Sequence, residues 1–315
     1  MADPFIWSGR FDGDEAIHRR FFQLMNNEYT SSFKFGLLGF KSDEGVRRNK
    51  GRLGAYNAPD IIRSQMASLP IHNEFNISDF GNIECNDGEL ETAQTELGTK
   101  IDELLTKNIT PIILGGGHET AFGSFQGIFN HIQRHHPNET IGIINFDAHF
   151  DLRKADHNTS GTPFLNAAEL AQAHQQPFHY MCLGIAEHGN TKALFETADR
   201  LNVTYLLDRA LTSDQLSNAM NAIQQFMSNI DHIYITIDLD VFPSYLAPGV
   251  SAPAVRGLNL EVFEALFTTI LNSDKVRLLD IVECNPQFDI DNRTSKLAAF
   301  IVYQFIHHIV SKEPS

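Results

Sequence analysis

Short, almost uninterrupted apolar runs alternate with longer amphipathic stretches along most of this chain. The apolar runs are expected to be strands at Phe35–Leu38, Ile109–Leu114, Ile141–Phe146, Tyr180–Leu183, Val203–Leu206, His232–Ile237 and Val276–Ile281. Helices are expected at Ala58–Ala67, Glu89–Lys107, Thr120–His135, Thr191–Arg200, Ser213–Ile230, Asn259–Leu271 and Thr294–Ile309. Because the strands do not alternate polar and apolar residues, both of their faces should be covered. The pattern therefore predicts an α/β fold of three layers, α/β/α, around a mostly parallel sheet.

No repeat, low-complexity tract or linker divides the 315 residues, so residues 1–315 are predicted to form a single domain. We expect a cytoplasmic protein without a membrane partner, because the chain shows neither a secretory signal nor an apolar stretch of about 18 residues. The three cysteines are widely spaced, which argues against a disulfide framework or a thiolate metal site.

The net charge of −15 argues against nucleic acid as a partner, since an acidic surface repels phosphate backbones. Bound divalent cations would neutralise part of this excess if several carboxylates were metal ligands. The positions of the acidic residues at strand ends support that idea.

Ligand-type side chains directly follow the expected strand Ile141–Phe146. Asp147, His149 and Asp151 alternate there, so in an extended chain their side chains would share one face. Functional groups of parallel sheets gather beyond the carboxyl ends of the strands. Three such residues at a period of two after a buried strand favour metal binding over a solvated strand end.

Two more strand ends carry residues of the same kind. Asp238 and Asp240 follow His232–Ile237, and His118 follows the run ending at Leu114 after three glycines, which would let the backbone turn sharply. Alone, His118 would more often be a capping or packing histidine, and the aspartate pair could be a helix cap. Together with the preceding segment, they favour a metal site.

Four carboxylates and two imidazoles suit Mn²⁺, Co²⁺, Fe²⁺ or Zn²⁺. Without metal, the converging carboxylates would repel one another, and two divalent ions would remove that repulsion. The remaining histidines, such as His131, His135, His136 and His307-His308, are expected on helix surfaces.

The segments GGGHE, DAHFD and TIDLDVF resemble the metal-binding segments of the arginase-type ureohydrolases, in the same chain order. The resemblance extends from Gly36 through Gly51–Ala55 and Pro59–Arg63 to the end of the chain. It implies a three-layer α/β fold, two Mn²⁺ ions per chain, and hydrolysis of a C–N bond in a guanidine or amidine. It further implies that one ion is held by His118, Asp147, Asp151 and Asp238. The other would be held by Asp147, His149, Asp238 and Asp240.

Several departures from the arginase sequence indicate which members of this family the chain resembles most. Gly116-Gly117-His118-Glu119 replaces the usual Gly-Gly-Asp-His-Ser, and the stretch Asn158–Phe164 lacks the histidine thought to shuttle protons. Together with Ser42–Asn49 and Asp147–Arg153, these variants resemble formiminoglutamases. Those enzymes split N-formimino-L-glutamate into L-glutamate and formamide in histidine degradation. The resemblance therefore implies this small-molecule amidine as substrate, and a homo-oligomeric enzyme.

The expected reaction is attack on the formimino carbon by a hydroxide that bridges the two ions. Asp151 would accept its hydrogen bond, and Glu283, in a segment that matches the family's Glu-x-Asn-Pro, would orient the cationic N–H groups. A guanidinium fork suits carboxylate binding, so Arg153 is expected to bind the glutamate part. The weaker candidates for that role are Ser160, Arg47 and Arg48, and the two arginines could equally belong to a solvated loop.

Three other functions remain open from the sequence. The chain could be a different ureohydrolase, acting on arginine, agmatine or a guanidino acid. A deacetylase of related fold is less compatible, because such sites generally hold one Zn²⁺ with fewer acidic ligands. An inactive, metal-binding interaction subunit is disfavoured by the intact ligand set together with Glu283.

Overall fold

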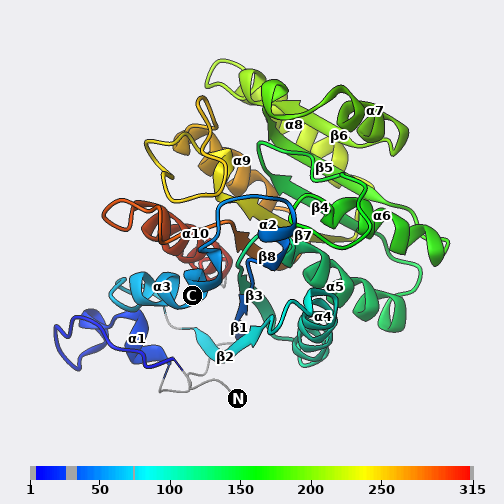
Figure 1. The fold of residues 1–315 in the computed structure, drawn as a ribbon. Helices are drawn as coiled ribbons and strands as arrows, with labels where there is room; N and C mark the ends of the chain where they lie inside the picture. Colours follow the sequence, from blue (N-terminus) through cyan, green and yellow to red (C-terminus); the bar gives the residue numbers. More distant parts are fainter. Residues whose placement is uncertain (1–4, 26–33, 74, 313–315) are drawn as a thin grey trace.

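The computed structural model describes residues 5–25, 34–73 and 75–312 (Figure 1). Within these residues, eight strands form one parallel sheet in the order β2-β1-β3-β8-β7-β4-β5-β6. The strands are β1 Lys34–Lys41, β2 Asn76–Glu84, β3 Thr110–Leu114, β4 Ile141–Phe146, β5 His179–Ile185, β6 Thr204–Leu207, β7 His232–Asp238 and β8 Val276–Val282. All seven predicted strands are present, and the predicted fold class is confirmed.

The helices are α1 Phe21–Leu24, α2 Glu44–Arg48, α3 Ala58–Ala67, α4 Leu90–Thr106, α5 Thr120–His135, α6 Pro163–Ala173, α7 Lys192–Arg200, α8 Leu216–Met227, α9 Leu260–Leu271 and α10 Arg293–Val310. One hydrophobic core packs α3, α8, α9 and α10 against one face of the sheet. A second core packs α4, α5, α6 and α7 against the other face. The two helical layers explain why nearly every central strand residue is apolar (Figure 1).

Four elements were not predicted: the short helices α1 and α2, helix α6 and strand β2. Strand β2 pairs only with β1 and is mostly half-exposed, so its sequence contains polar residues such as Asp79 and Asn82. An edge strand does not need the continuous apolar run that identifies a buried one. Helix α6 begins at Pro163, which fits the first turn of a helix because proline lacks the N–H that would be unpaired there.

The positions of the central strands determine where the predicted ligands lie. Strands β3, β8, β7 and β4 are successive neighbours, so the segments after their carboxyl ends meet at one edge of the sheet.

No helix among the described residues is long and apolar enough to cross a membrane. The assignment of residues 1–315 to a single domain stays a prediction, although all eight strands share one sheet.

Candidate metal centre and active site

His118, which follows β3, lies at the centre of a group of carboxylates at the ends of β4 and β7. Its Nδ1 is 3.1 Å from Asp147 Oδ2, 3.0 Å from Asp151 Oδ2 and 3.0 Å from Asp238 Oδ2. The Nδ1 atom is buried, yet it makes no hydrogen bond with any of these oxygens. A ring nitrogen that faces three carboxylate oxygens in this way fits shared coordination of a divalent cation.

A second group forms around His149. Its Nδ1 lies 3.0 Å from Asp240 Oδ2 and 3.6 Å from Asp147 Oδ1, so the Asp147 carboxylate belongs to both groups. Asp238 belongs to the first group only, and its Oδ1 accepts a hydrogen bond of 2.8 Å from the Asp240 N–H. The structure thus brings all six predicted ligands together. Sharing of Asp238 by two ions stays a prediction.

The electrostatics of the cluster favour cations. Burial, reinforced by the charges of Asp240 and Asp147, raises the pKa of Asp238 well above its usual value. Burial and the Asp147 charge likewise raise the pKa of Asp151. Burial opposes protonation of His118, but the adjacent carboxylates raise its pKa well above the ordinary range. So much negative charge in a buried volume is stable only if protons or metal ions neutralise it.

Glu283 follows β8 and lies beside His118. Its Oε1 accepts a hydrogen bond of 2.9 Å from the His118 backbone N–H, whereas its buried Oε2 has no hydrogen-bond partner among the described residues. Burial, followed by the nearby charge of Glu119, raises the pKa of Glu283 to about 8. The side chain is therefore fixed through one oxygen and has the other available for a ligand.

Two residues of the site have a strained backbone. Asp151 has φ 49° and Glu283 has φ 63°, both in the left-handed region that non-glycine residues rarely adopt. Such conformations cost on the order of 1–3 kcal/mol each and persist where the surrounding structure enforces them, often at functional sites. This strain could not be predicted from the residue types.

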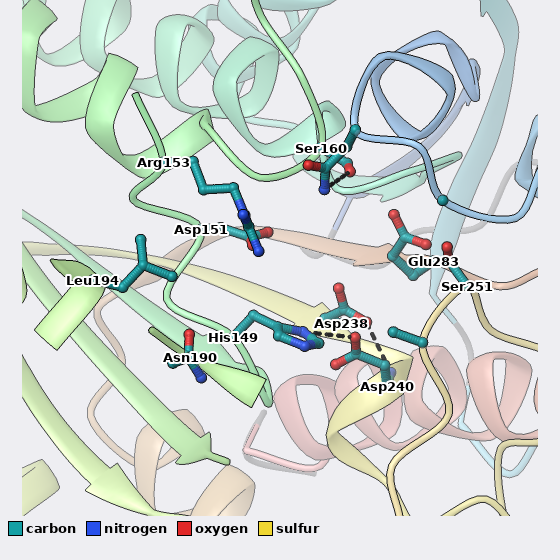
Figure 2. A pocket seen from close by; sticks show the side chains of 13 residues that line it. His149, Asp151, Arg153, Ser160, Asn190, Leu194, Asp238, Asp240, Ser251 and Glu283 are labelled. Carbon is teal, nitrogen blue, oxygen red and sulfur yellow. Dashed lines mark hydrogen bonds and ion pairs between the residues drawn. The ribbon is translucent and has the colours of Figure 1, made fainter. Parts of the chain in front are cut away.

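A cavity of about 220 Å³ opens over the cluster (Figure 2). It is lined by Asn49, Gly51, His149, Asp151, Arg153, Ser160, Asn190, Leu194, Asp238, Asp240, Ser251, Ala252 and Glu283. Its size suits a ligand of a few tens of atoms at most, and its lining combines anionic groups at the base with one guanidinium at the side.

Two of the four predicted substrate-binding residues line the cavity, and two do not. Arg153 points into the cavity (Figure 2), and its guanidinium makes no hydrogen bond or ion pair with another described residue. Ser160 also lines the cavity, where its Oγ accepts a hydrogen bond of 3.1 Å from Asn49 Nδ2. Arg47 and Arg48 do not line it. Arg47 pairs with Glu44, and Arg48 pairs with Glu44 and Glu91 and donates to backbone carbonyls, so both bind other parts of the protein.

Residues 33–308 match the sequence model of the Arginase family. The chain belongs to the arginase family. Over 311 residues it is 46% identical to a formimidoylglutamase of Aeromonas hydrophila, with 97% of this chain and 98% of that protein covered. Over another 311 residues it is 41% identical to a formimidoylglutamase of Chromobacterium violaceum, with 98% and 99% covered.

Solved structures of the arginase family share this fold. A formiminoglutamase of Trypanosoma cruzi with Mn²⁺ matches with a TM-score of 0.80 at 22% identity, covering 94% of this chain and 99% of that one. A formimidoylglutamase of Bacillus subtilis matches with a TM-score of 0.81 at 22% identity, covering 96% and 95%.

Polar residues inside two strands contact two of the predicted ligands, and sequence reasoning missed them. Thr236 Oγ1 lies 3.2 Å from His118 Nε2, which orients the ring. Asn145 Nδ2 donates to Asp147 Oδ2 at 3.0 Å. Each of the two residues interrupts an apolar strand two positions before a ligand, and that interruption was the available signal. Such partners hold metal ligands in place and increase their affinity.

The glycines before His118 allow both a bend and close packing. None of the three has a positive φ. A Cβ at Gly116 would lie 1.8 Å from the carbonyl oxygen of Ser42, and one at Gly117 would lie 2.2 Å from a carboxylate oxygen of Glu119. The backbone bends at Gly116 and Gly117, as predicted, and the close approach to Ser42 and Glu119 is a further reason for glycine there.

Proposed function

We propose that this protein is a formimidoylglutamase, which hydrolyses N-formimino-L-glutamate to L-glutamate and formamide with two Mn²⁺ ions. One observation carries the proposal. The carboxylate–imidazole cluster, Glu283 and Arg153 all border one small cavity. Relatives that are 41–46% identical over nearly the whole chain and are named formimidoylglutamases support this reaction over others of the family.

In this proposal the six predicted ligands hold the two ions. His118, Asp147, Asp151 and Asp238 hold one ion, and Asp147, His149, Asp238 and Asp240 hold the other. The grouping of the donor atoms around His118 and His149 supports the assignment. When bound, a pair of such ions lowers the pKa of water from 15.7 to about 7 and so supplies a nucleophile at neutral pH.

The protein's own acidic groups position the reactants. Asp151 accepts a hydrogen bond from the attacking water and then carries its proton to the departing nitrogen. Glu283 receives the N–H groups of the cationic amidine at Oε2, the oxygen without a partner in the protein. The His118 N–H fixes the other oxygen, so the carboxylate is oriented before the substrate arrives. Exclusion of water strengthens this charge pair.

Arg153 and Ser160 bind the glutamate part of the substrate. The Arg153 guanidinium pairs with a carboxylate, because burying that carboxylate without a partner would cost several kcal/mol. Asn49 donates to Ser160 Oγ, which leaves the Ser160 O–H hydrogen available to the substrate. Arg47 and Arg48 have no part in this binding, because their side chains already pair with Glu44 outside the cavity.

The decisive experiment compares formiminoglutamate, arginine, agmatine and guanidinobutyrate as substrates of the Mn²⁺-loaded protein. We expect formamide from formiminoglutamate to form far faster than urea from the three guanidines. Faster release of urea would replace the substrate assignment with that of another ureohydrolase. No turnover of any of the four by fully metal-loaded protein would favour an interaction subunit. Size-exclusion chromatography and cell fractionation test the accompanying expectations of a homo-oligomer and a cytoplasmic location.

A further inference from the structure

A cluster of histidines lies at the edge of the sheet opposite the cavity that binds substrate in the proposed function. A second cavity, of about 460 Å³, opens at the amino ends of β3, β7 and β8. Its lining includes His131, His136, Glu139, His232 and Arg277. These residues take no part in the proposed reaction.

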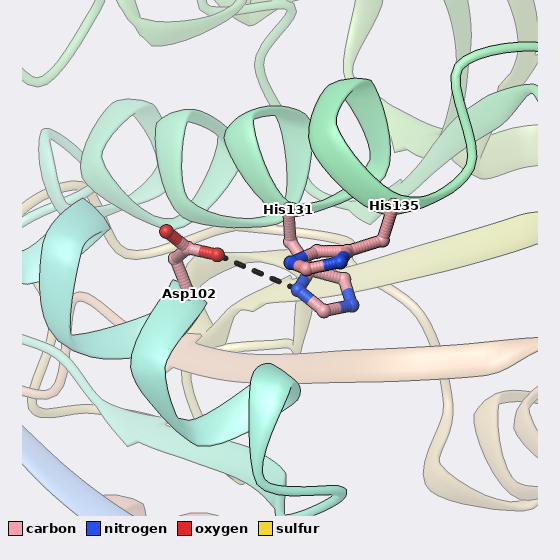
Figure 3. A group of neighbouring side chains, drawn as sticks. All are labelled: Asp102, His131 and His135. Carbon is pink, nitrogen blue, oxygen red and sulfur yellow. Dashed lines mark ion pairs between the residues drawn. The ribbon is translucent and has the colours of Figure 1, made fainter.

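Three side chains at this edge converge on one point (Figure 3). His131 and His135 are one turn apart on α5, with ring centroids separated by 4.7 Å. Asp102 reaches them from α4, and its Oδ1 lies 3.4 Å from His131 Nδ1. One ligand atom from each of the three residues lies within 4.8 Å of the other two. Helices α4 and α5 are packed side by side, so the arrangement does not depend on a loop.

We propose that Asp102, His131 and His135 form a second metal site, for a transition cation of the Zn²⁺ class. Two imidazoles and one carboxylate are a donor set that such a cation accepts, with water in the fourth position. The Asp102 Oδ1 is buried and has no hydrogen-bond partner among the described residues, so it is available as a ligand.

The surroundings of the cluster also suit a cation. His135 lies in the last turn of α5, where the helix dipole favours positive charge. Arg134 pairs with the other carboxylate oxygen of Asp102 and so orients the group without occupying Oδ1. Burial, followed by the neighbouring imidazoles, lowers the pKa of His131 to about 4. Its ring is therefore neutral at pH 7, which is the form that binds metal.

A rival group nearby is less suitable. His136, Glu139 and His232 also bring three ligand atoms close together. However, His232 Nδ1 accepts a hydrogen bond of 3.2 Å from the Arg277 guanidinium, and its Nε2 pairs with Glu139. Both nitrogens of His232 are thus engaged. The structure favours the group on α4 and α5.

The test is zinc binding by the Mn²⁺-loaded full chain. Equilibrium dialysis against micromolar Zn²⁺, followed by elemental analysis, should show one Zn²⁺ per chain with the Mn²⁺ content unchanged. The same zinc should raise the midpoint of thermal unfolding, because an ion that bridges α4 and α5 binds only the folded state.

His135→Ala is the informative variant, because the side chain is exposed and its loss should not disturb folding or turnover. It should weaken zinc binding at least about tenfold, since even indirect partners of a metal contribute 10- to 100-fold. Asp102→Asn should have a similar effect. The matched control is His308→Ala, on α10 in the other helical layer, which should bind zinc like the native chain.

Three results would overturn the proposal. The native chain could take up zinc only as it loses manganese, which would place the zinc in the active site. His135→Ala and Asp102→Asn could bind the extra ion as tightly as the native chain. Finally, His136→Ala could abolish zinc binding while His135→Ala preserves it, which would assign the ion to the rival group. None of these measurements depends on turnover. Failure of the second metal site would therefore leave the proposed reaction unaffected, and failure of the proposed reaction would leave the second metal site unaffected.

Discussion

Glu283 is held in a left-handed backbone conformation with one carboxylate oxygen bound to the His118 N–H and the other unpaired. In the proposed reaction the unpaired oxygen balances the positive charge of the amidine. The strain and the burial are both consistent with a residue that is positioned in advance for its ligand.

The substitution Glu283→Gln should separate this role from a structural one. The glutamine carbonyl can still accept the His118 N–H, so both metal ions should stay bound. A neutral amide cannot balance the amidinium charge, and we expect kcat to fall by about 10²–10³. Steady-state kinetics together with elemental analysis provide the measurement. Retained activity with intact metal content would reduce Glu283 to a structural group.

Arg153 should control affinity rather than metal content. Arg153→Ala removes the guanidinium that faces the cavity, and the KM for formiminoglutamate should rise by about 10- to 100-fold, or roughly 1.4–2.8 kcal/mol. Arg153→Lys should restore only part of the affinity, because an ammonium cannot bind both carboxylate oxygens in a planar fork.

The neighbouring Lys154 supplies the control for Arg153, since it is exposed and does not line the cavity over the cluster. Lys154→Ala should leave KM unchanged. If Arg153→Ala has no effect on KM either, another group must bind the substrate carboxylate, and our assignment of Arg153 fails.

Individual residues show which parts of the candidate site could be predicted from the sequence. The six candidate ligands were predictable, because each follows a recognisable strand in a parallel sheet. Thr236 and Asn145 were not, because the sequence does not show whether a polar strand residue contacts a ligand or only its own neighbours. The misassignment of Arg47 and Arg48 has the same cause. Glu44 pairs with both arginines within α2, a short helix that was not predicted, and Glu91 reaches Arg48 only because α4 packs nearby.

Among the elements, strand β2 depends on a side chain from helix α3. The guanidinium of Arg63 is fully buried and contacts both carboxylate oxygens of Asp79, at 2.9 and 2.8 Å, and Asn82 Oδ1 at 2.7 Å. It therefore attaches the edge strand to the helix that covers it. The sequence could not show this, because a buried arginine and a surface arginine look the same in an amphipathic helix.

Arg63→Ala should consequently destabilise the fold. Removing one partner of a buried charge pair costs about 3–5 kcal/mol, because the other charge is left buried without compensation. Urea unfolding measures the change in the free energy of unfolding. Arg47→Ala is the comparison, and it should stay within about 0.5 kcal/mol of the native value because that side chain is 62% exposed. Equal effects for the two variants would refute the assigned role of Arg63.

At the scale of the whole molecule, the net charge of −15 includes the four clustered aspartates that are expected to hold metal ions. Removing the ions with a chelator should lower the midpoint of thermal unfolding by roughly 5 °C or more, because ions present at 100 times their Kd contribute about 2.7 kcal/mol per site. Restoring Mn²⁺ should reverse the shift. A midpoint that is independent of chelator would argue against a metal site in the folded chain.

Metal stoichiometry tests how the cluster is divided. We expect two ions per native chain. Asp147→Ala should disturb both ions because its carboxylate belongs to both groups, whereas His118→Ala should weaken mainly one. Elemental analysis of the purified variants measures this directly. Fully active native protein with one ion or none would contradict the two-ion site.

The order of the strands has a consequence for biosynthesis. The last two strands to be made, β7 and β8, occupy the middle of the sheet and separate β3 from β4. Until they emerge from the ribosome, the inner edges of β3 and β4 have no strand to pair with, and such edges promote aggregation. The contact between His118 and Glu283 spans 165 residues, so loop closure over that length must precede it. A nascent chain that ends before β7 would contain His118 and the segment Asp147–Asp151 but would lack Asp238 and Asp240, so metal could not complete the predicted site.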